Sequence, residues 1–549
     1  MAVMTDESRV PDAAHRRIAE LRAWLQVRDG LPVRLIETHI SWVLLSDALA
    51  YKLKKPVRLP FLDYTTLARR RRSCEAELHV NARLAPTLYL DVIEVRSGSD
   101  GASLDEVGPV VDVALRMRRF PDGALWSEMV ATDTLAPSDV DALARRLTGF
   151  HDAAAIAPTD SRFGTAAVHR RALRRLIAAI DAWPSLNEPG AAATAWSALR
   201  GWVFEQSQLL APLREARRQA GRVRECHGDL HPANLLKIGD EVTAFDAIEF
   251  DDELRWIDVL HDISFVAMDL IAHGRPGLAS RFVNAYLESS GDYDGIAMLR
   301  WSMVERALVR AQVMSLVERE GARPAQRCVA SDYLRLAKAL SRGGDPRLAI
   351  TNGLPGSGKT FVSQRLLESV GAIRVRSDVE RKRLFGLDAL QSSRAAVPEG
   401  IYDADATTRT YARLLEVARV TLAAGWPVLV DAAFLRRAER ARFAALADAR
   451  AVPFTIVDCQ AEPALLRRRL AQRAAAGNDA SEADGSVLDF LTERAEPLDA
   501  QEREHAIVAN DAPSARGAML AERWLSAGGA VRPAPGRPGR TRRTGARAR

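Results

Sequence analysis

Cysteine is scarce in this sequence, and its few copies are widely scattered. Cys74, Cys226, Cys328 and Cys459 include no C-x-x-C pair. Disulfide scaffolds and zinc ribbons both need closely spaced cysteines, so the sequence argues against these two classes. The same pattern fits a reducing compartment.

Long apolar runs are also missing. The first residues, "MAVMTDESRVPDAAHRR", contain no apolar core of the length that a secretion signal needs, and no later segment approaches eighteen continuous apolar residues. We therefore expect a cytoplasmic protein that does not enter the membrane.

Positive charge is concentrated in one place. The formal net charge is +6, yet residues 531–549 carry seven arginines and no acidic residue. Without them the chain has a net charge of −1, which argues against a groove for a nucleic-acid backbone. We expect the Arg/Pro/Gly-rich tail, residues 529–549, to be disordered.

The chain is long enough for two or three domains, because 549 residues exceed one ordinary core. Strand-like runs and one long helix, near 66–84, fill residues 31–120, and helical patterns fill 137–340. This order predicts an α+β domain of two lobes around a cleft over residues 1–340. The segment "SRGGDPR", Ser341 to Arg347, marks a boundary because its glycines and proline break the pattern.

Beyond the boundary, short apolar strands alternate with helices. The strands are expected at "LAITN", "AIRVRS", "PVLVDA", "PFTIVD" and "AIVAN". This alternation predicts an α/β domain over residues 346–528, with a parallel sheet covered on both faces.

The stretch "CHGDLHPANLL", Cys226 to Leu236, concentrates groups that can bind metals. His227, Asp229 and His231 could hold zinc. The spacing favours a kinase, because Asn234 follows Asp229 by five residues and Asp246 follows it by seventeen. A kinase needs one carboxylate to accept the proton of the acceptor hydroxyl, and an amide oxygen and a second carboxylate to hold Mg²⁺ on ATP.

These residues resemble the catalytic loop H-G-D-x-x-x-x-N of the aminoglycoside phosphotransferase and choline kinase families, over roughly residues 31–320. The resemblance implies a protein-kinase-like fold in which Lys52, in "LAYK", contacts ATP phosphates and Glu77 is its helix partner. Lys54 and Lys55 are rivals for the lysine, and Glu75 is the rival for the glutamate. Asp262 resembles the aspartate that braces this loop, although it could equally cap a helix.

Glycine is missing from "THISWVLLS", where such kinases place the hairpin that covers the nucleotide. Aminoglycoside-type kinases often use a serine in this turn. The resemblance implies that Ser41 donates to a phosphate through its hydroxyl or its backbone amide.

The segment "GLPGSGKT" fits the phosphate-loop pattern G-x-x-x-x-G-K-[ST], between an expected strand and an expected helix. Its backbone amides and the helix N-terminus attract phosphate, its lysine reaches the outer phosphates, and its last hydroxyl binds Mg²⁺. The residues expected to bind the cofactor are Gly353, Pro355, Gly356, Ser357, Gly358, Lys359 and Thr360.

The stretch "SDVERKR" follows the next expected strand. Asp378 and Arg381 resemble the acceptor-side pair of polynucleotide kinase, gluconate kinase and related P-loop kinases, in which the aspartate takes a proton and the arginine manages negative charge. A helix capped by Asp378 is the structural alternative. Asp431 closes "PVLVD" and is expected to orient the Mg²⁺ shell.

"LLRRRLAQR" resembles the lid of these P-loop kinases. A solvated helix face is the alternative, and the sequence does not select among Arg467, Arg468, Arg469 and Arg473.

Together these motifs predict a bifunctional kinase that uses ATP and Mg²⁺ and acts on hydroxyl groups of small molecules. Two alternatives remain: a regulatory ATP-binding protein that transfers nothing, and a nucleic-acid end kinase. The motifs do not identify the acceptors or the oligomeric state.

Overall fold

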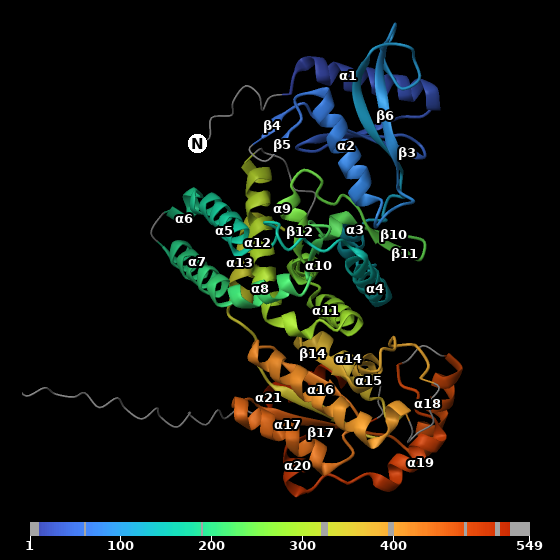
Figure 1. Cartoon of the computed structure of the whole chain (residues 1–549), viewed down its shortest axis with the longest axis vertical. Helices are drawn as coiled ribbons and strands as arrows, with labels where there is room; N and C mark the ends of the chain where they lie inside the picture. The colour runs from blue at the N-terminus through green and yellow to red at the C-terminus, as the bar shows by residue number, and fades with distance from the viewer. Residues whose placement is uncertain are drawn as a thin grey trace, which may run out of the picture.

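We describe a computed structural model of the chain, covering residues 10–59, 62–187, 190–319, 328–393, 400–476, 480–510 and 516–527. The expected tail, 529–549, lies outside these residues. The structure has a first lobe at one end, a helical region in the middle and a second domain at the other end (Figure 1). Among the described residues, no helix combines the length and apolar character needed to cross a bilayer.

The first lobe is an antiparallel sheet with two helices, α1 (Asp12–Asp29) and α2 (Leu67–Asn81). The strands run in the spatial order β1 (Arg34–Glu37), β2 (Ser41–Leu45), β3 (Leu49–Lys54), β8 (Val110–Arg118), β6 (Tyr89–Gly98) and β7 (Gly101–Ser103). A separate small hairpin joins β4 (Arg58–Leu59) to β5 (Leu62–Asp63).

Helix α1 was not expected from the sequence. It buries Ile18, Leu21 and Leu25 against the sheet residues Trp42 and Leu44. These helix positions recur at intervals of three and four residues, so one face of α1 is apolar and covers the sheet.

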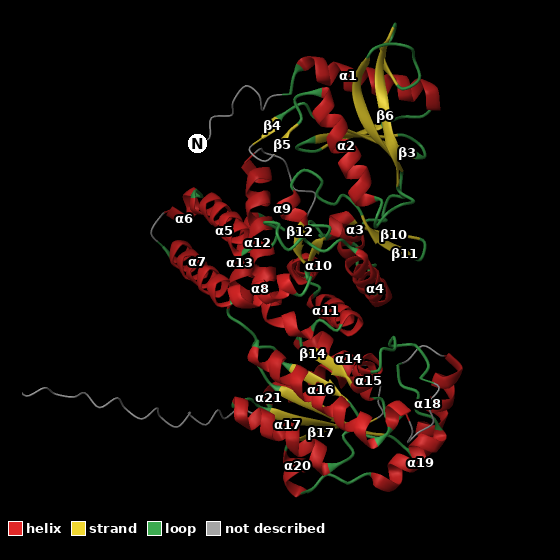
Figure 2. Cartoon of the chain, viewed as in Figure 1, coloured by secondary structure: helices red, strands yellow, loops and turns green. Residues whose placement is uncertain are grey.

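The second lobe is mostly helical (Figure 2). Its helices are α3 (Trp126–Ala131), α4 (Pro137–Ala153), α5 (Ala166–Asp181), α6 (Pro184–Asn187), α7 (Ala191–Leu209), α8 (Ala211–Gln219), α9 (Asp252–Arg255), α10 (Val259–Ala272), α11 (Pro276–Ser290), α12 (Ile296–Arg319) and α13 (Ala330–Ser341). Short strands frame the catalytic loop: β9 (Val223–Glu225) pairs with β12 (Trp256–Asp258), and β10 (Leu235–Ile238) pairs with β11 (Glu241–Ala244). The short helices η2 (Pro232–Asn234) and η3 (Tyr293–Gly295) complete this lobe.

The second domain has a five-stranded parallel sheet. Its strands run in the order β14 (Ile373–Arg376), β15 (Val428–Asp431), β13 (Leu348–Asn352), β16 (Phe454–Gln460) and β17 (Ala506–Asn510). Its helices are α14 (Lys359–Val370), α15 (Ser377–Leu384), η4 (Gly400–Tyr402), α16 (Ala404–Ala423), α17 (Arg437–Arg450), α18 (Pro463–Ala476), α19 (Gly485–Arg494), α20 (Ala500–Glu504) and α21 (Arg516–Ser526). The predicted fold class is confirmed for both domains.

One hydrophobic core crosses from the first domain into the second. It contains Phe282 and Tyr286 of α11 as well as Ile350 of β13, Val375 of β14 and Tyr411 of α16. Helix α11 packs on α14 and on β14, and α12 packs on α16. The two domains are therefore joined by buried apolar surface and not by the linker alone.

We expect Phe282→Ala to lower the free energy of unfolding by about 3–5 kcal/mol, because it removes a fully buried ring from this core. Urea denaturation followed by circular dichroism measures the change. Leu209→Ala is the matched control, since Leu209 is 65% exposed and should shift stability by less than about 0.5 kcal/mol. Equal effects of the two substitutions would contradict the assignment of Phe282 to the core.

Candidate active sites

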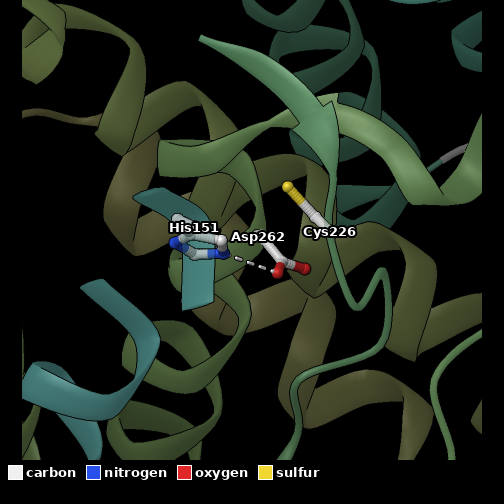
Figure 3. A group of neighbouring side chains, drawn as sticks. All are labelled: His151, Cys226 and Asp262. Carbon is white, nitrogen blue, oxygen red and sulfur yellow. Dashed lines mark hydrogen bonds and ion pairs between the residues drawn. The ribbon is translucent and has the colours of Figure 1, made fainter. Parts of the chain in front are cut away.

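A buried aspartate on α10 holds the catalytic loop in place. Asp262 accepts hydrogen bonds from the backbone amides of His227 (3.1 Å) and Gly228 (2.8 Å), and its Oδ2 lies 3.1 Å from His151 Nε2 of α4 (Figure 3). The cap of α10 is a different residue, Asp258, whose side chain accepts from the Leu260 amide. Asp262 thus acts as a loop brace and not as the helix cap.

Gly228 is the position in this loop where only glycine fits. Its φ is +87°, and an added Cβ would lie 2.7 Å from the carbonyl oxygen of Leu254. With glycine at this position, the loop packs against the Leu254 carbonyl, and Asp229 comes directly after the Gly228 amide that Asp262 binds.

His151, Cys226 and Asp262 are the one metal-capable group among the residues that the structure describes, with ligand atoms within 4.8 Å of one another (Figure 3). Burial raises the pKa of the Cys226 thiol well above its usual value, and the thiol donates to the Ile257 carbonyl (3.4 Å). Asp262 is already bound to two backbone amides and faces His151, so the ligand atoms of this group have protein partners. We assign this group to the support of the loop.

His227 is unsuited to the zinc alternative because both its ring nitrogens have partners. Nε2 donates to the Phe245 carbonyl (2.9 Å), and Nδ1 accepts from the Asp229 amide (3.3 Å). Burial lowers the pKa of His227, against the attraction of Asp262 and Asp229, so the ring is neutral. Its role is to tie the loop to the strand end that carries Asp246.

Asp229 and Asn234 lie side by side. Asn234 Nδ2 donates to the carboxylate Oδ2 of Asp229 (3.1 Å) and to its backbone carbonyl (3.0 Å). His231 Nε2 is 3.4 Å from the same carboxylate oxygen. Burial raises the pKa of Asp229, but His231 and Arg310 outweigh it and hold that pKa well below the usual value. The carboxylate is therefore ionised at neutral pH.

Lys52 links the two lobes. Its ammonium donates to Glu77 of α2 (2.7 Å) and to Asp246 (2.5 Å), which reaches it from beyond β11. Burial lowers the pKa of Lys52, but Asp246 and Glu77 more than reverse this and raise it well above the usual value. Asp246 remains 42% exposed on the side chain, so it is accessible to solvent.

The rival residues are also placed by the structure. Lys54 contacts the other Glu77 oxygen (2.5 Å) and Glu249, while Lys55 pairs with Glu37 (2.7 Å). Glu75 is exposed on α2. Of the three lysines, Lys52 is the one that contacts both Glu77 and Asp246, and a lysine–glutamate pair is part of the protein-kinase pattern.

The structure places Ser41 at the start of β2. Its backbone amide donates to Thr38 Oγ1 (3.0 Å), and its hydroxyl is fully buried without a hydrogen-bond partner among the described residues. The amide is thus already used, and the expected phosphate contact of Ser41 stays a prediction for its hydroxyl alone.

The phosphate loop lies between β13 and α14, as the sequence predicts. Gly353, Gly356 and Gly358 have φ values of +146°, +81° and +91°. A Cβ on Gly353 would lie 2.5 Å from the Cys459 carbonyl oxygen, which explains the glycine there. The Ser357 hydroxyl is buried without a hydrogen-bond partner. A loop with an unused buried donor suits an anion such as phosphate.

Lys359 lies over this loop and donates to the carbonyls of Gly353 (2.8 Å) and Leu354 (2.9 Å). Burial lowers its pKa, and the nearby carboxylates of Asp431 and Asp378 oppose the shift. The lysine and both predicted acids thus share one electrostatic environment.

One cavity of about 1030 Å³ brings together the predicted residues of the second domain, except Gly353, which does not line it. Its lining includes Pro355, Gly356, Ser357, Gly358, Lys359, Thr360, Asp378, Arg381 and Asp431. Thr360 and Asp431 offer the oxygen ligands that Mg²⁺ prefers.

The acceptor-side pair lies on α15. Asp378 is in the first turn of this helix, which has no side-chain cap. Arg381 donates to the Ile401 carbonyl (2.8 Å), and its guanidinium carbon lies 5.2 Å from the ring centre of Tyr402. Asp378 therefore lines the cavity without capping the helix. Arg381 also lines the cavity, and its contacts with Ile401 and Tyr402 fix its position.

The structure selects among the lid arginines of α18. Arg469 donates to the Gly356 carbonyl of the phosphate loop (3.3 Å), and Arg473 donates to the Ala483 carbonyl (2.7 Å); both line the cavity. Arg467 pairs with Asp489 (2.9 Å) on the exposed side, and Arg468 is also exposed. One face of α18 is therefore solvated and the other closes the cavity.

Sequence reasoning missed the charged side of α12. Glu305 and Arg306 are buried there, and the Arg306 guanidinium lies 4.9 Å from the ring centre of Phe265, which also contacts the His231 ring. Burial raises the pKa of Glu305 to about 7, against the attraction of Arg306 and Arg214. The sequence did contain a signal for these buried charges, namely the charged residues inside the otherwise apolar run "WSMVERALVRAQVM".

Two protein families match different parts of the chain. The phosphotransferase enzyme family matches residues 56–299, and an AAA domain family matches residues 348–498. Uncharacterized protein Rv2004c of Mycobacterium tuberculosis is 30% identical over 468 residues, which cover 81% of this chain and 87% of the relative; Uncharacterized protein Mb2027c of Mycobacterium bovis matches equally. The chain belongs to their family. This fusion family joins a phosphotransferase domain to a P-loop kinase domain.

Solved structures resemble parts of the fusion. A choline/ethanolamine kinase family protein from Mesorhizobium loti is 14% identical and covers 60% of this chain and 94% of its own, with a TM-score of 0.36. A gluconokinase from Sinorhizobium meliloti 1021 is 20% identical and covers 34% of this chain and 92% of its own, with a TM-score of 0.24.

We expect Asp262→Asn to lower the free energy of unfolding by about 1–3 kcal/mol at pH 7, because the amide cannot accept every bond that the carboxylate accepts. Burial raises the pKa of Asp262, but His151 and His227 lower this pKa by more than burial raises it, so the net shift is downward. The stabilisation is thus complete above the unfolded-chain pKa, near pH ~4, and is lost as pH falls through the folded value.

Denaturation across pH 2 to 7 measures this difference. Asp240→Asn, in the exposed turn between β10 and β11, is the control and should keep the slope of the parent. If Asp262→Asn kept the same acid slope as the parent, the brace would not depend on an ionised carboxylate.

Proposed function

We propose that the chain is a bifunctional ATP-dependent phosphotransferase. Its two domains, residues 1–340 and 346–528, each move the γ-phosphoryl group of ATP to a hydroxyl group of a small molecule. The observation that supports this proposal is a clustering of charged and polar side chains in each domain. Lys52 contacts Asp246 and Asn234 contacts Asp229 in the first, and Lys359, Asp378 and Asp431 line one cavity in the second.

In the first domain, Lys52 binds ATP phosphates and Glu77 fixes its position. Asn234 and Asp246 would hold Mg²⁺, which would supply positive charge to balance the phosphates. Asp229 accepts a hydrogen bond from the acceptor hydroxyl and takes its proton as the phosphoryl group moves. Its depressed pKa supports a role in orientation as much as in proton removal.

In the second domain, the phosphate loop and Lys359 hold ATP, and Thr360 and Asp431 contribute to the Mg²⁺ shell. Asp378 takes the proton of the second acceptor, and Arg381 orients that acceptor. Arg469 and Arg473 supply positive charge near the phosphates from the lid, which favours a transition state with charge on the equatorial oxygens.

We expect two ATP sites per chain, each removed by one substitution. Lys52→Met should abolish nucleotide binding in the first domain, and Lys359→Met in the second, because each removes a cation from the phosphates. Isothermal titration calorimetry with Mg²⁺ and a non-hydrolysable ATP analogue should give a stoichiometry near two for the parent and near one for either variant. A stoichiometry of two in both variants would refute the lysine assignments.

We also expect Asp229→Asn and Asp378→Asn each to remove a different transfer reaction. The loss should be roughly 10²–10⁴-fold, the scale of general base catalysis, while ATP binding persists. Labelled ATP and a metabolite extract, with products separated by chromatography, would detect the transfer. Each variant is the control for the other. If both variants kept all the products of the parent, the general-base assignments of Asp229 and Asp378 would be refuted. A parent chain that bound ATP but gave no product would favour the regulatory ATP-binding alternative.

A further inference from the structure

Helix α11 of the first domain covers the free edge of the second domain's sheet. Strand β14 is the edge strand, next to β15 alone. Asn284 of α11 accepts from the Arg374 amide (2.6 Å) and donates to the Ala372 carbonyl (2.9 Å). The asparagine thus binds the edge as a neighbouring strand would, and satisfies groups that an isolated second domain would expose.

One helical turn further along α11, Glu288 reaches the same strand. Its Oε2 accepts from Arg374 Nη2 (3.0 Å) and its Oε1 accepts from Arg376 Nη1 (2.8 Å). Burial raises the pKa of Glu288, but Arg376 and Arg374 lower this pKa by more than burial raises it, so the net shift is downward. An ionised carboxylate of the first domain therefore balances two guanidinium groups of the second.

Both arginines that Glu288 binds also face residues of the P-loop site. Arg374 Nη1 donates to Ser363 Oγ (3.2 Å), and Ser363 Oγ donates to Asp431 Oδ2 (2.9 Å). Arg376 Nε lies 4.0 Å from the same Asp431 oxygen, and Arg376 lines the cavity. A chain of polar contacts thus joins α11 to the carboxylate that we assign to the Mg²⁺ shell.

We propose that Glu288 is a positioning residue for the P-loop site: it holds Arg374 and Arg376 so that Asp431 stays available to a divalent cation. The inference rests on the proposed function of Asp431. Without the negative charge of Glu288, both guanidinium groups still face Asp431, Arg376 directly and Arg374 through Ser363, and they compete with the cation for it. The first domain thereby completes the cation site of the second.

The test measures how nucleotide binding depends on Mg²⁺ in the full chain. Lys52→Met silences the first site, and calorimetry follows binding of ADP at increasing Mg²⁺ concentrations. Adding Glu288→Gln should raise the Mg²⁺ concentration for half-maximal binding about tenfold, within the usual range of coupling between sites. Glu288→Asp keeps the charge on a shorter side chain and should give a smaller shift in the same direction, should the glutamine variant not fold.

Glu368→Gln is the matched control. It breaks another ion pair across the same interface, Arg281 to Glu368 (2.8 Å), while Arg281 keeps Asp141 as a partner. The Mg²⁺ dependence should equal that of the Lys52→Met background. Equal shifts in the Glu288→Gln and Glu368→Gln chains would show a general loosening of the interface and overturn the inference.

A second substitution tests the cause. Arg376→Gln removes one competing cation, so the Glu288→Gln/Arg376→Gln double variant should return most of the way to the background value. A double variant that stays as impaired as Glu288→Gln, or a Glu288→Gln chain with no shift, would reject the positioning role. If the Lys52→Met background bound no ADP, the proposed function of the second site would fail first, and this inference with it.

Discussion

Charge held out of water must be balanced, and this requirement shapes both candidate sites. Lys52 is stable between the lobes because Glu77 and Asp246 face it, and Asp262 is stable because two amides and His151 surround it. In the second domain, Arg374 and Arg376 depend on Glu288 in the same way. Removing one member of such a set leaves a buried charge without its partner. Each site therefore depends on all of its charged residues together.

The same requirement bears on why two kinase-family domains share one chain. The apolar core runs through α11, α12 and α16, and Asn284 occupies the edge of β14. An independent P-loop domain would have to cover that edge itself. Here the phosphotransferase domain covers it and supplies a carboxylate, Glu288, that binds two arginines of the second domain. The two domains therefore depend on each other's side chains and are not merely linked along the chain.

The sequence was sufficient for features encoded locally. The strand and helix patterns predicted the fold class of both domains. The loop spacings led to predictions at Asp229, Asn234, Asp246 and Lys359, whose roles stay predictions; the structure brings Asn234 against Asp229, Lys52 against Asp246, and Lys359 to the cavity. Helix α1 was missed although its apolar spacing was present. For Ser41, a one-dimensional motif does not reveal that Thr38 takes its amide. Glu288 lies 88 residues before Arg376, and no local pattern links residues so far apart.

The edge of β14 has a consequence for separating the domains. Cutting the backbone between α13 and β13 would sever one covalent link but leave α11 packed on β14 and α14. The two fragments would stay associated as a non-covalent pair, whereas the C-terminal fragment made alone would present an open strand to solvent and to other copies of itself. A protease nick and a truncated gene would thus give opposite outcomes.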